Sequence, residues 1–139
     1  MKTNTPLTIY NKYYDQDLQK EVYQRKVIPA VMWEDRKDRN VIATGGNLAA
    51  NQATIYIPFT WDLPTFLKPK AWLALADKTT NWTIQKGDIL VKGELTQELG
   101  SSYTPSDLKA DYDDVLSVAS LDTMDLGSFA LQHWKIGAQ

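Results

Sequence analysis

Cysteine is absent from this 139-residue chain, and histidine occurs once. Without cysteine there can be no disulfides, thiolate nucleophiles or zinc–thiolate sites. A Ser-His-Asp catalytic set would have to use His133, which lies in an apparent strand near the end of the sequence. A lone histidine in a strand is typical of a packing or hydrogen-bonding residue, and one histidine among scattered carboxylates gives no zinc-ligand spacing. We therefore expect no cofactor, no metal and no enzyme activity.

Long apolar runs and an excess of basic residues are also missing. No stretch approaches the roughly 18 to 20 apolar residues that a membrane span requires, so we expect no membrane partner. Residues 1–6 lack the apolar core of a signal peptide, which predicts synthesis in the cytoplasm. The formal net charge is −2, whereas sequence-independent binding of nucleic acid needs a clustered basic surface. DNA is thus expected only as a molecule that the protein guides without holding.

Helical periodicity is scarce, and short alternating apolar runs dominate the chain. They predict seven or eight short strands, at residues 7–10, 22–28, 30–33, 53–57, 82–84, 89–91, 115–121 and 129–136. Pro29 places the second run at an edge, at a bend or at a strand end. Residues 70–75 fit either a strand or one to two helical turns, and residues 106–109 favour a short helical turn. The sequence predicts one all-β domain over residues 1–139, a small β-barrel or sandwich with long loops and at most short helical turns.

The back half of the chain is organised as two predicted strand pairs. Residues 82–95 form the first pair around a turn or bulge at Gly87-Asp88. Residues 115–138 form the second pair, which a turn at residues 122–128 interrupts. The alternation at the start of this second pair places Val115 and Leu121 on one face and Val118 on the other.

Three segments are predicted to be loops. Residues 34–40 carry charges of both signs, typical of a solvated hairpin tip, and include Arg36 and Arg39, whose guanidinium groups suit phosphate. Residues 45–52 begin with a Gly-Gly turn that matches no phosphate-binding loop. Residues 98–114 form a long polar excursion that ends in an acidic cluster containing Asp111, Tyr112 and Asp113. The twelve-residue calcium-loop pattern is absent from this cluster, which favours a solvated loop over a metal site.

Aromatic residues are plentiful, with five tryptophans and seven tyrosines. Such residues favour strands and fill cores, but they also concentrate at subunit interfaces. Trp33, Trp61 and Trp134 are therefore candidate interface anchors, provided that they are exposed.

Several motifs together resemble a family of small proteins from tailed phages and prophages of Gram-positive bacteria, among them minor capsid proteins. The matching segments are residues 7–13 (LTIYNKY), 23–25 (YQR), Trp33, 56–58 (YIP), 67–70 (LKPK), 86–94 (KGDILVKGE), 126–128 (LGS) and 132–134 (QHW). A Gly-Asp turn before an apolar strand, followed by a returning strand pair, is similar to head-closure or stopper proteins. Phe129 departs from the family pattern, which has proline after the Gly-Ser turn.

The resemblance implies a virion structural protein of the head–tail connector, or neck, most simply a head-completion or stopper subunit. The implied partners are further copies in a ring, the portal and adaptor on one side, and the tail on the other. Packaged double-stranded DNA would pass through the channel without specific binding. Assembly would take place in the host cytoplasm, and the loops at residues 34–40, 45–52 and 98–114 would contact neighbours or line the channel.

Two other interpretations stay open. The chain would fit a different virion position, as a tail-completion, tail-terminator or minor capsid protein. It would also fit a barrel that binds single-stranded nucleic acid with Tyr and Trp as stacking platforms, although the acidic composition argues against this. An enzyme would need chemistry outside the recognised motifs.

Overall fold

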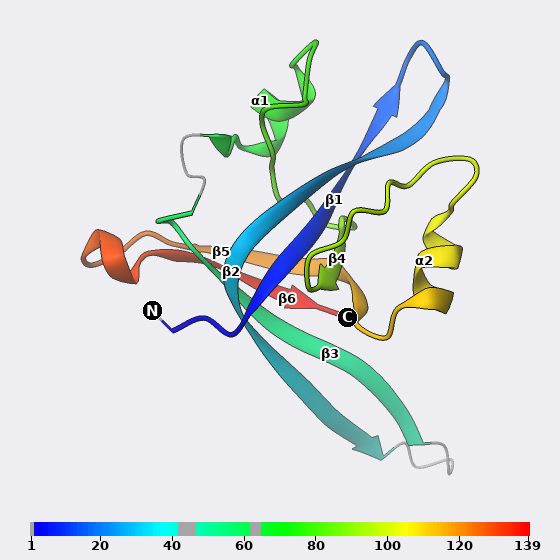
Figure 1. Cartoon of the computed structure of the whole chain (residues 1–139). Helices are drawn as coiled ribbons and strands as arrows, with labels where there is room; N and C mark the ends of the chain where they lie inside the picture. The colour runs from blue at the N-terminus through cyan, green and yellow to red at the C-terminus, as the bar shows by residue number, and fades with distance from the viewer. Residues whose placement is uncertain (1, 42–46, 62–64) are drawn as a thin grey trace.

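The computed structural model describes residues 2–41, 47–61 and 65–139, and for residues 36–41 and 47–51 it describes the backbone alone. Within these ranges, antiparallel strands close a barrel in the order β1-β2-β3-β6-β5-β4 (Figure 1). The strands are β1 (Thr5–Asp15), β2 (Lys20–Val41), β3 (Asn47–Pro58), β4 (Ile89–Lys92), β5 (Val115–Met124) and β6 (His133–Ala138). The connections contain the short helices α1 (Pro69–Leu73) and α2 (Pro105–Asp111), and one 3-10 turn, η2 (Phe129–Leu131). The predicted all-β fold with short helical turns is confirmed.

Strand β2 is long because it pairs with two different strands in succession. Its first part pairs with β1, and its second part, from Met32 onward, pairs with β3. The pairing with β1 shifts register between Ile28 and Val31, and Pro29 lies in this irregularity. Proline is tolerated at such a bulge because it has no N–H to donate to the ladder. Of the three outcomes expected at Pro29, the structure has the bend within a continuing strand.

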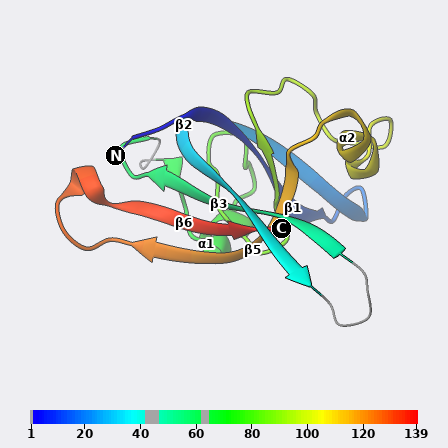
Figure 2. The ribbon, with the colours of Figure 1, turned by 90° about the horizontal axis from the view of Figure 1, so that it is seen from below.

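The predicted loops at residues 34–40 and 45–52 are largely strand, so this prediction is wrong for the described part. Met32 to Val41 pairs without interruption with Tyr56 to Asn47. The part of this pairing beyond the β3–β6 ladder, Arg36–Val41 with Asn47–Gln52, forms a two-stranded arm that extends beyond the barrel (Figures 1 and 2). Residues 34–40 contain neither proline nor glycine, so nothing in them breaks the ladder, and a mixed-charge pattern suits a two-stranded ribbon as well as a loop. Residues 42–46 lie outside the described residues.

The first predicted strand pair, residues 82–95, contains only one strand, β4. Trp82 makes only an isolated parallel bridge to Phe66, whereas β4 pairs with β1 on one side and with β5 on the other. The predicted turn before β4 is present, and Gly87 adopts a φ of +93° there. This four-residue strand therefore closes the barrel instead of forming a local hairpin.

The second predicted pair is confirmed as the hairpin of β5 and β6, with one change in its faces. A register shift between Val118 and Ser120 inserts an extra residue into β5. Because a bulge reverses the alternation that follows it, Leu121 packs against the same core as Val118. The prediction that Leu121 shares a face with Val115 is therefore wrong.

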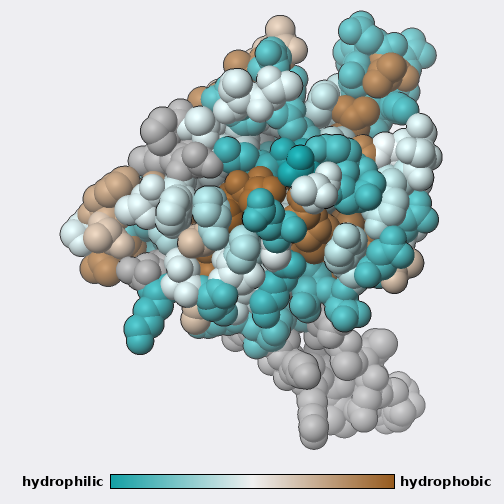
Figure 3. Space-filling model, viewed as in Figure 1, coloured by the Kyte–Doolittle hydropathy of each residue, from teal (hydrophilic) through white to brown (hydrophobic). Residues whose placement is uncertain are grey.

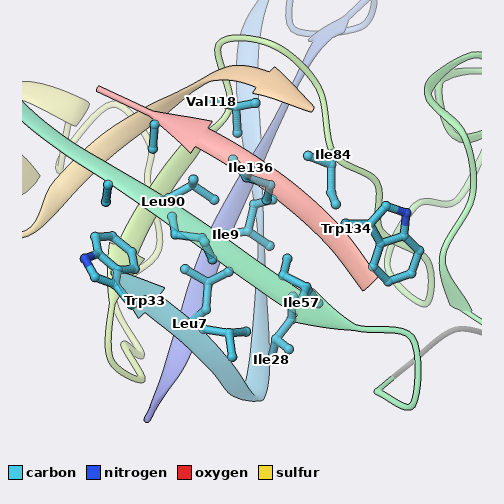
Figure 4. Close-up of a cluster of buried hydrophobic side chains, with 14 of the residues drawn as sticks. Leu7, Ile9, Ile28, Trp33, Ile57, Ile84, Leu90, Val118, Trp134 and Ile136 are labelled. Atoms are coloured by element: carbon cyan, nitrogen blue, oxygen red, sulfur yellow. The ribbon is translucent and has the colours of Figure 1, made fainter. Parts of the chain in front are cut away.

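Two apolar clusters lie on the two sides of β4. The larger one fills the barrel, and Leu90 points into it (Figure 4). The smaller one lies outside the barrel wall beneath α2 and consists of Tyr10, Ile89, Val91, Leu95, Leu99 and Leu108. Strand β4 is thus covered on both faces, as expected for a strand that reads as a continuous apolar run.

Candidate interaction surface

Four aromatic side chains close one end of the barrel. The ring of Trp134 lies 4.3 Å from Phe59, 4.4 Å from Phe66 and 5.6 Å from Trp82, measured between centroids. Phe66 and Trp82 are 5.0 Å apart and nearly edge to face, a geometry that adds about 0.5 to 1.5 kcal/mol beyond the area buried. Figure 4 places Trp134 and Trp33 at opposite ends of the core. The chain therefore has a distinct aromatic end.

An open groove of about 640 Å³ lies beside this cluster and is called here the aromatic groove. The segment before α1, α1 itself and β5 line it together with the aromatic cluster; its residues include Phe59, Phe66, Pro69, Ala71, Leu121 and Trp134. Lys68 is the charged residue of the lining, and it is exposed. The described surface thus carries an apolar concavity with a basic residue beside it.

The hairpin between β5 and β6 carries an exposed apolar tip next to this groove. The apolar tip consists of Met124, Leu126, Phe129 and Leu131, and Leu126 is 85% exposed. Apolar atoms gather at the left of Figure 3, where Figure 1 shows this hairpin. The turn is held internally: the Leu131 N–H donates to the Ser128 carbonyl at 2.9 Å. Exposed apolar patches on otherwise polar surfaces mark interaction sites.

The apolar tip was missed by sequence reasoning, which treated residues 122–128 as a turn and residues 129–136 as a strand. The available signal was composition. Turns between strands are normally polar, yet Leu126, Phe129 and Leu131 fall within or beside this one. Apolar residues in and beside a turn between strands are thus a sequence signal for an exposed apolar surface.

The acidic cluster lies at the other end of the molecule. Figures 1 and 2 both place α2 and the β5–β6 hairpin at opposite ends. The Asp111 carboxylate accepts a 2.6 Å hydrogen bond from the Tyr103 hydroxyl, and this bond is the main cause that raises the pKa of Tyr103 to about 12. Tyr112 and Asp113 are exposed. Across the described part of the chain, no three potential metal-binding side chains come together.

The tryptophans proposed as anchors divide into buried and exposed ones. Trp33 is 3% and Trp134 is 2% exposed, so the expectation that they are free surface anchors is wrong. Both point inward from strands, and the Trp33 indole N–H is satisfied by Asp35 at 2.8 Å. Trp61, in the turn after β3, is 40% exposed and stays a candidate. Arg36 and Arg39 lie in the paired arm, and their side chains are not among those that the structure describes. The remaining candidates lie in the core, in the turn after β3 and in or beside α2, so the structure does not bring the candidate residues together into one site.

A buried polar cluster fixes the turn before β4, and sequence reasoning did not identify it. The Asp88 carboxylate accepts hydrogen bonds from the Asn11 side chain at 2.7 Å, the Gln85 N–H at 2.9 Å and the Lys12 N–H at 3.0 Å. Burial raises the pKa of Asp88 to about 6, while these hydrogen bonds and the Lys12 charge act in the opposite direction. Asn11 also donates to the Thr83 carbonyl at 2.7 Å. The cluster ties β1 to the turn and has a structural role.

A second, polar hollow of about 650 Å³ lies between the β1–β2 hairpin and the residues after α1. The Lys78 ammonium lies 4.8 Å from the centre of the Tyr13 ring and donates to the Leu75 carbonyl at 2.7 Å. Trp72 of α1 packs edge to face on Tyr13 at 5.5 Å. The Lys78 ammonium thus helps to hold α1 and the residues after it against the barrel.

Taken together, the described residues define a small closed antiparallel barrel with an arm, an apolar tip and an aromatic groove. The chain belongs to DUF6751, a family of unknown function, whose model matches residues 2–139. Neither the curated proteins nor the solved structures contain a match to it. None of the helices in the described residues has the length and apolar character needed to cross a membrane.

Proposed function

We propose that the chain is a structural protein of the head–tail connector of a tailed phage, acting as a subunit of a head-completion or stopper ring. The observation that carries the proposal is a closed barrel from which the β2–β3 arm and the β5–β6 hairpin project in different directions (Figures 1 and 2). A ring subunit needs such a body because a heterologous ring contact joins two different surfaces of each copy. The β2–β3 arm and the apolar tip supply separate surfaces of this kind.

The charge of the chain supports a channel that DNA passes through. A net charge of −2 gives no electrostatic grip on phosphate, so the genome would slide past the subunits and not adhere to them. In this role the arm, formed by Arg36–Val41 of β2 and Asn47–Gln52 of β3, would reach a neighbouring copy or the channel. The portal–adaptor assembly would bind one side of the ring and the tail the other, in virions assembled in the host cytoplasm.

Cryo-electron microscopy of intact virions from a phage that encodes the chain tests this function. We expect density for the barrel in a ring between the portal–adaptor assembly and the tail. Density at the tail end, in the tail terminator ring or on the capsid would instead assign one of the other virion positions. Absence of the chain from the particle would contradict every virion role.

A deletion phenotype separates two roles within the neck. A stopper retains packaged DNA, so its loss should give tailless heads that leak their genome. A protein that only joins head to tail should, when deleted, leave stable full heads and free tails. Electron microscopy and nuclease sensitivity of the purified heads distinguish these outcomes.

A further inference from the structure

We propose that the apolar tip of one copy inserts into the aromatic groove of a second copy of this chain. This contact builds on the ring assembly proposed above and names the residues that would join adjacent subunits. It does not depend on where in a virion such a ring would lie.

The first support is the match between the two surfaces. The tip is a convex turn with four exposed apolar side chains, and the groove is concave, with Phe59, Phe66 and Trp134 among its lining residues. Burial of apolar surface contributes roughly 25 cal/mol per Å², so joining the two surfaces would be favourable. Among the lining residues, Lys68, Ala71 and Thr123 are exposed and Phe66 and Leu121 are half-buried, whereas Phe59 and Trp134 are only 7% and 2% exposed.

The second support is that the tip cannot enter the groove of its own chain. Leu121 and Thr123 of β5 and Trp134 of β6 line the groove, and the tip continues from these same strands. The ladder between the strands runs as far as the pair Met124 and His133. This pairing holds the tip away from the wall that the strands themselves form, so a tip that enters the groove must come from a second copy.

The third support is charge. Asp125 is exposed in the tip, directly before Leu126. Lys68 lines the groove, and Lys70 is exposed on α1 beside it. A tip that enters the groove of another copy would bring its carboxylate toward these ammonium groups. Opposite charges at the rim favour the correct orientation more than they add affinity.

The natural absence of cysteine allows a direct test by disulfide cross-linking of full-length protein. Two differently tagged single variants, Leu126→Cys in the tip and Ala71→Cys in the groove, are mixed and oxidised. We expect the mixed dimer to be the main cross-linked product. The matched control replaces Ala71→Cys by Ser102→Cys, an exposed position in the loop before α2. Equal cross-linking in the control, or a predominance of Leu126→Cys homodimers, would overturn the proposal.

Self-association in solution gives a second, independent readout. We expect sedimentation equilibrium of the unmodified chain to reveal concentration-dependent oligomers, and Leu126→Asp to abolish them without lowering Tm, because the side chain is exposed. Leu18→Asp, at an exposed leucine of the β1–β2 turn, is the control and should associate like the unmodified chain. An unmodified chain that stays monomeric, or a Leu126→Asp variant that still associates, would refute the contact.

The two experiments fail separately from the proposed function. Tip-to-groove cross-links in a protein that is absent from virions would support the proposed contact and contradict the proposed virion role. Location of the chain in the neck, together with normal assembly of the Leu126→Asp variant, would support the virion role and contradict the proposed contact. Oligomers that stop at two copies would keep the contact but contradict a ring.

Discussion

Asp88 is a buried carboxylate whose three hydrogen-bond partners all donate to it. The Asp88→Asn substitution replaces one acceptor oxygen by an amide that donates, so at least one buried donor loses its partner. At pH 7, where the carboxylate is ionised, we expect the free energy of unfolding to fall by about 2 to 3 kcal/mol, measured by urea denaturation. Asp113→Asn, at an exposed position, is the control and should change it by less than about 0.5 kcal/mol. Equal stability of the two variants would show that the Asp88 hydrogen bonds are not needed.

The same carboxylate should make stability depend on pH. Burial raises the pKa of Asp88 from 3.8 to about 6, with Lys12 on β1 and Tyr23 on β2 as the nearby titratable groups. The folded chain therefore binds this proton more tightly than the unfolded chain does. Its contribution to stability is fully present below about pH 3.8 and is lost as the pH rises through about 6.

The measurement is the difference in unfolding free energy between the unmodified chain and Asp88→Asn across this pH range. We expect the unmodified chain to gain on the variant as the pH falls from 7 toward 4, by up to about 3 kcal/mol. A difference that does not change with pH would mean that Asp88 titrates alike in the folded and unfolded states.

Gly87 tests the backbone of the same turn. Its φ of +93° is unfavourable for any residue with a Cβ, although a methyl group there would meet nothing closer than the Lys12 ammonium at 3.8 Å. We expect Gly87→Ala to lower the free energy of unfolding by about 1 to 2 kcal/mol through backbone strain alone. Gly100→Ala is the matched control, because Gly100 has open space around its Cα and no positive φ. Thermal melts of both variants decide the point, and a neutral Gly87→Ala would contradict it.

Among the elements, α2 depends most clearly on its ends. A helix of seven residues is too short to be stable alone, so its cap and its one buried residue, Leu108, must hold it. Thr104 and Asp107 form a capping box in which each side chain accepts from the backbone N–H of the other residue. We expect Thr104→Ala to lower the free energy of unfolding by about 1 kcal/mol. Ser106→Ala, two residues further along and also exposed, is the control and should lower it much less. Hydrogen exchange of the α2 amides should become faster in Thr104→Ala only. Equal exchange rates in the two variants would show that the capping box does not stabilise α2.

The elements also show which parts of the fold local sequence can predict. Alternation predicted the start of β1 and the β5–β6 hairpin, and the residues around Ser106 favoured the short helix, because these signals act within a few residues. The path of β2 through Pro29 and residues 34–40 was not predictable, since it depends on pairing with two strands that lie on either side of it in the chain. The burial of Trp33 and Trp134 likewise follows from closure of the barrel.

At the scale of the whole molecule, closure rests on its shortest strand. The four residues of β4 pair with β1 and with β5, and the chain covers them from inside by Leu90 and from outside by the cluster beneath α2. Closure leaves the β5–β6 hairpin at one end of the molecule and α2 at the other (Figures 1 and 2), and the aromatic groove is lined by residues of that hairpin. The candidate site could not be predicted because the groove brings together Phe59 after β3, α1 and the segment before it, β5 and β6 only in the closed barrel. The acidic cluster, in contrast, was visible in the sequence.

The whole molecule also bears on the alternative of a barrel that binds single-stranded nucleic acid. Stacking needs exposed aromatic faces. Trp33, Trp72, Trp82 and Trp134 are buried, which leaves Tyr14, Trp61, Tyr112 and Phe129 as the exposed aromatic residues of the described chain. The net charge of −2 adds no attraction for phosphate. We therefore expect a flat anisotropy titration of a labelled oligothymidylate, even at low salt. Binding that weakens with salt and is lost in Trp61→Ala would instead favour the nucleic-acid role over the neck.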